Sequence, residues 1–246
     1  MLCGLAVLFA ACSSQPSAPS ANERRADAYL QQGIDALQRK AYAEALRALF
    51  EANKYNPKSA DIWTDLGIAY AGKNEVGKAE ESWRKALLID PRHDDARLNL
   101  GILYFQKKRY PEAERILKEA SKNIAYHRAD IVAFQLAQIY LAQNKPLLAE
   151  EQLKLATRDN ANNCAAWSQL GNLQKERGDY NEATQSMKGA TMGLCYKNPR
   201  AHYELATLYL KNHDVPQAKS KLLEIIQLFP TSEWAEKSEA TLNMIR

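Results

Sequence analysis

Apolar and polar residues follow a helical spacing from residue 26 onward, and the spacing itself repeats. When Gly33, Gly67 and Gly101 are aligned, the apolar positions around them recur with a period of 34 residues. The clearest copy reads ADIWTDLGIAYAGKNEVGKAEESWRKALLIDP, in which apolar residues three and four positions apart form one stripe on each of two helices. Small residues where two helices cross allow their backbones to approach, and large residues fill the space to the next copy. The pattern predicts an all-α protein built from antiparallel helix pairs.

The second copy also matches the tetratricopeptide pattern at nearly every position: Trp63, Leu66, Gly67, Tyr70, Ala79, Trp83, Ala86 and Pro91. Five looser copies are in register with it. The fourth copy begins 36 residues after the third, and the sixth begins 35 after the fifth, so connecting loops at NIAYHRAD and CYKNP take up the extra residues. We predict a right-handed superhelix of six tetratricopeptide repeats over residues 26–230, with the first helix of each repeat lining the concave face. Residues 231–246 then form a capping helix.

The amino-terminal segment predicts export and anchoring. Residues 1–11 are uncharged and apolar but too few to cross a bilayer as a helix, so they fit a secretory signal peptide. Ala10 and Ala11 precede Cys12, which resembles the lipobox of bacterial lipoproteins, whose cysteine is lipidated. An ordinary signal peptide cut after Ala11 is the alternative. Residues 12–25, rich in Ser and Pro, are expected to form a flexible tether. The two serines after Cys12 look like an outer-membrane sorting signal, with the protein body facing the periplasm.

Composition and motifs argue against several functional classes. Lys and Arg exceed Asp and Glu by 33 to 29, and this small surplus is spread along the chain, which does not favour nucleic-acid binding. The spacing of a phosphate-binding loop is present at Gly67, Gly72 and Lys73. However, Asn74 follows in place of the required Ser or Thr, and the glycines lie in a predicted repeat helix. The four histidines lack metal-ligand spacing. We therefore expect no catalytic residue, metal, cofactor or small-molecule substrate.

Two cysteines remain in the predicted mature body. Cys164 opens the first helix of the fifth repeat, and Cys195 follows the end of its second helix, so antiparallel packing brings them together. In an oxidising periplasm we expect a structural disulfide, and two free thiols are the alternative. Closing this loop is worth about 3.5 kcal/mol in the chain-entropy account of disulfides.

Repeats of this kind usually bind partners through positions 2, 5, 9, 12 and 13 of each first helix. In the first four repeats these positions are largely apolar, and the predicted partner-binding groove comprises Leu30, Ile34, Leu37, Ile68, Leu98, Ile102, Phe105, Ile131, Phe134 and Leu141. In the last two repeats they are more polar: Ala165, Ser168, Asn172, Lys175, Glu176, Arg200, Tyr203, Thr207, Leu210 and Lys211. Two interpretations stay open for the apolar set. The side chains pack on one another, or they form a patch that binds an amphipathic helix or strand of a protein partner.

The lipobox, the tether, the six repeats, the cysteine pair and the final FPTSEWAEKSEATLNMI segment together resemble the type IV pilus biogenesis and stability lipoproteins, the pilotins of the PilF/PilW type. The resemblance covers essentially the whole chain. It implies a non-enzymatic outer-membrane lipoprotein that helps the pilus secretin reach the outer membrane and assemble into its multimeric pore. A general repeat lipoprotein that scaffolds cell-wall hydrolases or other envelope machinery is the nearer alternative, and an enzyme subunit or glycan-binding module is the more distant one.

Overall fold

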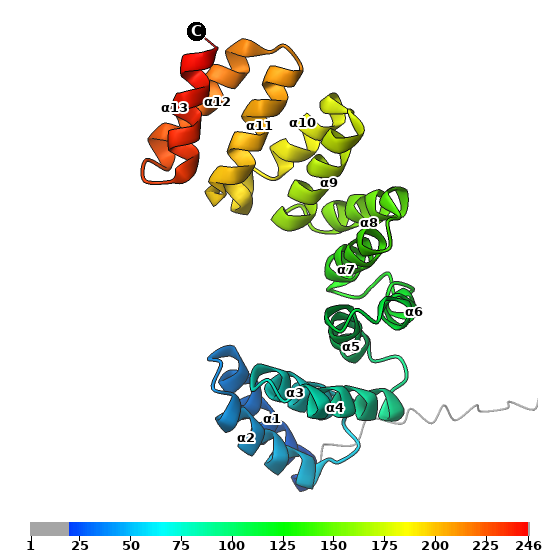
Figure 1. The fold of residues 1–246 in the computed structure, drawn as a ribbon. Helices are drawn as coiled ribbons and strands as arrows, with labels where there is room; N and C mark the ends of the chain where they lie inside the picture. The colour runs from blue at the N-terminus through cyan, green and yellow to red at the C-terminus, as the bar shows by residue number, and fades with distance from the viewer. Residues whose placement is uncertain (1–19, 246) are drawn as a thin grey trace, which may run out of the picture. The chain divides into compact units, whose positions relative to one another are not determined.

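The computed structural model describes residues 20–245, and these fold entirely into helices, with thirteen α-helices and one short 3-10 helix (Figure 1). The all-helical repeat fold predicted from the sequence is confirmed. The chain forms two compact units, Met1–Ile89 and Asp90–Arg246, called unit 1 and unit 2 below. Unit 1 contains α1 (Ala21–Gln38), α2 (Tyr42–Tyr55), α3 (Ala60–Gly72) and α4 (Val76–Ile89).

Unit 2 contains the remaining helices, and each packs mainly against the next one along the chain. Their bounds are α5 (Asp94–Gln106), α6 (Tyr110–Ala120), α7 (Ala129–Ala142), α8 (Pro146–Asp159), α9 (Cys164–Arg177), α10 (Tyr180–Gly189), the 3-10 helix η1 (Gly193–Lys197), α11 (Pro199–Lys211), α12 (Val215–Leu228) and α13 (Glu233–Met244). The last helix starts at a Ser cap, because the Ser232 hydroxyl accepts a hydrogen bond from the Ala235 amide at 3.2 Å.

The first helix begins earlier than the sequence analysis expects. Ser20 and Glu23 form a capping box: the Ser20 hydroxyl accepts from the Glu23 amide, and the Glu23 carboxylate accepts from the Ser20 amide. This pair satisfies two amides that a helix start leaves unpaired, so α1 starts at Ala21. The expected tether over residues 12–25 is therefore wrong for residues 21–25. The signal peptide, Cys12 and the rest of the tether lie outside the described residues.

Glycine at the helix crossings has a packing reason that the structure makes explicit. A Cβ on Gly67 would lie 2.6 Å from Cδ1 and 2.7 Å from Cε2 of the Trp83 ring. Trp83 is almost fully buried, and its indole nitrogen donates to the Thr64 carbonyl at 3.1 Å. A Cβ on Gly72 would overlap the ring of Tyr42. Both glycines of the phosphate-loop imitation therefore serve helix packing.

The turn between the two helices of every repeat contains one residue in the left-handed conformation. These residues are Lys40, Asn74, Lys108, Asn144, Gly178 and His213, all with positive φ. Their intervals reproduce the irregular repeat lengths that the sequence predicts. Only one of the six is glycine, although a side chain in this conformation costs about 1 kcal/mol. The backbone conformation therefore repeats with the same spacing as the apolar positions.

The two-residue insertion before α7 forms an ordered loop over residues 121–128. The Tyr126 hydroxyl donates to Asp95 at 2.7 Å, and Arg128 contacts the same carboxylate at 2.9 Å. Asn123 donates to the neighbouring Asp94 at 2.7 Å. Burial, followed by the hydrogen bond to Asp95, raises the pKa of Tyr126, so this phenol stays protonated as a donor. These bonds tie the loop to the start of α5.

Candidate functional site: a polar pocket on the first-helix face of repeats five and six

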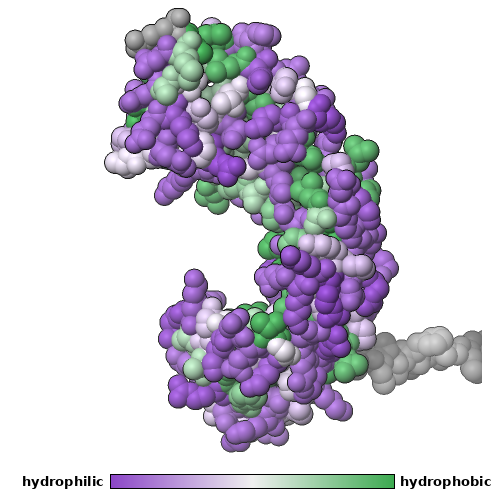
Figure 2. Space-filling view, viewed as in Figure 1, coloured by the Kyte–Doolittle hydropathy of each residue, from purple (hydrophilic) through white to green (hydrophobic). Residues whose placement is uncertain are grey.

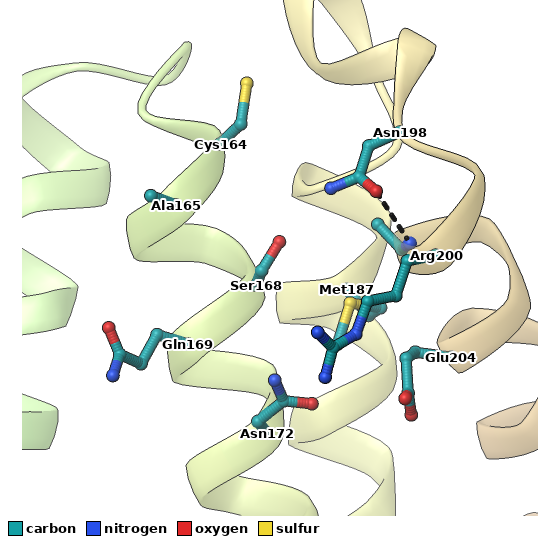
Figure 3. A pocket seen from close by; sticks show the side chains of 10 residues that line it. Cys164, Ala165, Ser168, Gln169, Asn172, Met187, Asn198, Arg200 and Glu204 are labelled. Carbon is teal, nitrogen blue, oxygen red and sulfur yellow. Dashed lines mark hydrogen bonds between the residues drawn. The ribbon is translucent and has the colours of Figure 1, made fainter.

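A pocket of about 390 Å³ lies on the first-helix face of the fifth and sixth repeats, in unit 2 (Figure 3). Its volume falls in the range of about 300–1,000 Å³ typical of ligand-binding sites. It is lined from α9 and α11, with one residue of α10 at its base: Cys164, Ala165, Ser168, Gln169, Asn172, Met187, Asn198, Arg200, Ala201 and Glu204. Polar side chains predominate.

Helical spacing explains why these side chains converge. Ala165, Ser168 and Asn172 are three and four residues apart on α9, so they share one face, and Arg200 and Glu204 do the same on α11. The α11 helix is capped at its start because the Asn198 side-chain oxygen Oδ1 accepts a hydrogen bond from the Ala201 backbone amide at 3.2 Å. Figure 3 shows Ser168, Asn172, Arg200 and Glu204 directed toward the space between the two helices.

The charges in and beside the pocket do not cancel. The Lys175 ammonium and the Glu204 carboxylate form an ion pair at 2.6 Å. Arg200 is exposed and has no hydrogen bond or ion pair among the described residues. The pocket therefore has one excess positive charge.

Two neutral polar groups also lack partners. The Ser168 hydroxyl oxygen is buried and has no hydrogen bond within the described part of the chain. The Asn172 amide lies partly exposed, and its side chain makes no hydrogen bond to described residues. Gln169, in contrast, accepts a hydrogen bond from Gln138 on α7. Buried polar groups are almost always hydrogen-bonded in folded proteins, so an unpaired hydroxyl in a pocket is a distinctive feature.

One lining residue of the pocket, Cys164, forms a disulfide. Cys164 and Cys195 are bonded with an S–S distance of 2.07 Å and a Cα–Cα distance of 5.2 Å. The bond joins the first residue of α9 to η1. The sequence analysis did not predict η1, which forms part of the connection between the fifth and sixth repeats, where the extra residue falls.

The segment held by this disulfide exposes apolar side chains. Met192, Leu194 and Tyr196 are 66%, 79% and 41% exposed, whereas Cys195 between them is buried. His202 on α11 is fully buried, and its Nε2 donates to the Tyr196 carbonyl at 2.8 Å. Burial lowers the pKa of His202 and favours the neutral ring, and the hydrogen bond to the Tyr196 carbonyl opposes this effect only in part.

The predicted groove residues have three outcomes. Leu98 is wrong as a groove residue, because its side chain is fully buried in unit 2. Leu30 and Leu37 pack against the buried cluster of unit 1, as the self-packing interpretation expects. The others are half-buried: Ile34 and Ile68 in unit 1, and Ile102, Phe105, Ile131, Phe134 and Leu141 in unit 2.

Phe105 and Phe134 lie at different heights on their helices. Phe105 is in the last turn of α5, where its ring centroid is 5.8 Å from that of Tyr110, and Phe134 is in the second turn of α7. Across the visible surface, hydrophobic residues appear as separate patches on a mainly hydrophilic background (Figure 2).

Within the part of the chain that the structure covers, no helix has the length and apolar character needed to span a membrane. The same residues contain no group of three or more His, Cys, Asp or Glu side chains that could hold a metal ion.

Residues 42–238 match the family described as the tetratricopeptide repeat protein 21 C-terminal ARM domain. The chain belongs to this family. Members are built from helical repeats, which agrees with the paired helices of both units. No protein of curated function matches the sequence.

Several solved structures share the repeat fold. PilF of Pseudomonas aeruginosa superposes with a TM-score of 0.76 at 28% identity, over 90% of this chain and 100% of PilF. PilW, a type IV pilus biogenesis factor, gives 0.70 at 20% identity, over 86% and 97% of the two chains. YrrB, a repeat protein with an unusual peptide-binding site, gives 0.60 at 22% identity, over 80% and 100%. The similarities to PilW and YrrB establish the fold alone.

Proposed function

We propose that this protein is a non-enzymatic, lipid-anchored scaffold of the type IV pilus machinery that acts as the pilotin for the pilus secretin. The observation that carries the proposal is the similarity to PilF, which extends over the whole PilF chain and 90% of this one at 28% identity. A shared repeat motif alone would not require such complete coverage, because repeat proteins vary widely in their number of repeats.

The first helices of unit 2 supply surface for a protein partner. Half-buried apolar residues on α5 and α7, among them Phe105 and Phe134, are followed along the unit by the polar pocket on α9 and α11. Apolar side chains give binding free energy, and unpaired polar groups select the partner. An amphipathic helix or extended segment of the secretin would contact both the apolar residues on α5 and α7 and the polar pocket on α9 and α11.

The proposed anchor is a lipid on Cys12, with the protein held at the outer membrane and facing the periplasm. The sequence around Cys12 supports this location, although these residues lie outside the described structure. The Cys164–Cys195 disulfide adds support, because stable disulfides form in oxidising compartments such as the periplasm.

The test is site-specific crosslinking in cells. A photo-crosslinking amino acid replaces Phe134 on the first-helix face, and the matched control carries it at Leu223, which is 51% exposed on the second helix of the sixth repeat. We expect the Phe134 position to capture the secretin and the Leu223 position to capture much less. Capture of a cell-wall hydrolase in place of the secretin contradicts the pilotin proposal and favours a general envelope scaffold.

A further inference from the structure

We propose that the polar pocket between α9 and α11 binds a carboxylate group of a partner polypeptide. Arg200 supplies the cationic contact, and Ser168 and Asn172 supply hydrogen bonds. The inference rests on the proposed protein-binding role and adds to it the chemistry of one contact. It concerns the polar part of the first-helix face, in the fifth and sixth repeats.

The charge arrangement favours an anion over a cation. Glu204 is the one carboxylate among the lining residues, and Lys175 already pairs with it at 2.6 Å. This pair leaves Arg200 as the charge without a partner within the described residues. A guanidinium can donate two parallel hydrogen bonds to one carboxylate, which makes Arg a better match for this group than for a neutral amide.

The neutral groups fit the same ligand. The buried Ser168 hydroxyl has no hydrogen-bond partner among described residues, so it has a free proton to donate toward a carboxylate oxygen. Asn172, one helical turn further along α9, has both an amide donor and a carbonyl acceptor. The donor suits the carboxylate, and the acceptor suits a backbone amide of the peptide that bears it.

The shape of the pocket admits a peptide segment. Ala165 and Ala201 face the pocket from α9 and α11 and leave room between the helices. A pocket of about 390 Å³ is large enough for an acidic side chain or a chain terminus together with the adjoining backbone.

The ligand carboxylate has two possible sources, a side chain or a C-terminus, and three N-acetylated pentapeptides distinguish them. One has a central Asp and an amidated end, one has neutral side chains and a free C-terminal carboxylate, and one is neutral and amidated. The full chain, labelled with 15N and purified in non-ionic detergent, is titrated with each peptide while amide signals are followed by NMR. At least one carboxylate peptide is expected to bind about tenfold more tightly than the neutral peptide and to shift the signals of Ser168, Asn172 and Arg200.

Two variants and one control test the contacts. Arg200→Gln should lower the affinity for the carboxylate peptide by about tenfold, the usual effect of losing one charge-assisted hydrogen bond. Lys219→Gln removes the same charge from α12, the second helix of the same repeat and outside the pocket lining, and should leave the affinity unchanged. Ser168→Ala should weaken binding without lowering the melting temperature of the free protein, because the hydroxyl has no partner in the fold.

The assignment is overturned if all three peptides bind equally, if none binds, or if Arg200→Gln binds like the wild type. These outcomes are separate from failure of the proposed function. Secretin assembly in cells can still depend on the protein when the pocket binds no carboxylate, and a carboxylate site can exist in a protein that captures no secretin.

Discussion

Replacing Gly67 with Ala tests the repeat packing at its best-defined crossing. The added methyl group would sit 2.6 Å from Cδ1 and 2.7 Å from Cε2 of Trp83, well inside van der Waals contact. Trp83 has little freedom to move away, because its ring is 4% exposed and its indole nitrogen donates to the Thr64 carbonyl. The indole must shift, and the buried hydrogen bond lengthens or breaks.

The magnitude follows from three contributions. Overpacking a core costs about 1–3 kcal/mol, and unpairing a buried hydrogen bond costs about 1–3 kcal/mol more. The higher helix propensity of Ala returns about 1 kcal/mol. The net expectation is that Gly67→Ala lowers the free energy of unfolding of unit 1 by about 1–5 kcal/mol.

Gly77 provides a matched control in the same unit. It lies on α4, and a Cβ there would meet no atom within 4 Å. Gly77→Ala therefore acts mainly through backbone entropy and should raise the free energy of unfolding by up to about 1 kcal/mol. Urea unfolding followed by tryptophan fluorescence and circular dichroism measures both changes as shifts of the midpoint in opposite directions. A Gly67→Ala protein as stable as the wild type, or a Gly77→Ala protein equally destabilised, would refute the packing account.

Three further predictions concern the anchor, the disulfide and a charged contact between repeats. Cys12→Ser should abolish incorporation of a tagged fatty acid and release the protein from the outer membrane; label that persists in the variant counts against the anchor. Mass spectrometry without reduction should detect a crosslinked Cys164–Cys195 peptide in periplasmic protein, whereas free alkylation of both thiols would disprove the bond. The hydrogen bond from Arg177, with Lys154 nearby, lowers the pKa of Glu150 to about 2. The ionised Glu150 therefore adds fully to the free energy of unfolding above about pH 4.5, and this stabilisation is lost as the pH falls toward 2. Glu150→Gln should therefore cost about 1–2 kcal/mol at pH 7 and much less near pH 2, and a pH-independent cost in urea titrations would contradict this assignment.

The fold was predictable because its signals are local and periodic. Apolar stripes and small residues at crossings, such as Gly67, report directly on which side of a helix is buried. The left-handed turn residues were not predictable, since Lys40 and Lys108 are of a residue type that seldom adopts positive φ. Their conformation comes from the short helix–helix turn and not from intrinsic preference.

The candidate site was predictable only in part. Ser168, Asn172 and Arg200 occupy register positions of the first-helix face, but the predicted groove comprises only apolar residues and omits them. Leu98 shows the opposite error. Its register position matches the groove, yet its side chain is fully buried. The position of a residue in the repeat predicts which side of its helix it lies on. Its burial depends also on the neighbouring helices, whose placement the sequence pattern does not predict.

The central claim is that the first-helix face of unit 2 binds the partner whose assembly the protein supports. Phe105→Asp combined with Phe134→Asp tests it, because both side chains are half-buried while Leu100, Tyr104, Leu136 and Tyr140 beside them fill the core. Placing two carboxylates where a partner must dehydrate them should cost several kcal/mol of binding free energy. Leu223→Asp, on an exposed second-helix position, is the control.

The decisive measurement is the amount of heat-resistant secretin multimer in cells that lack the wild-type gene and express each variant, read beside the thermal melt of each purified protein. The account predicts that the double variant melts close to the wild type and yields few or no multimers, while Leu223→Asp restores them. Normal multimers with a native melt would contradict a role for this face in secretin assembly, and a collapsed melt would assign Phe105 and Phe134 to the core.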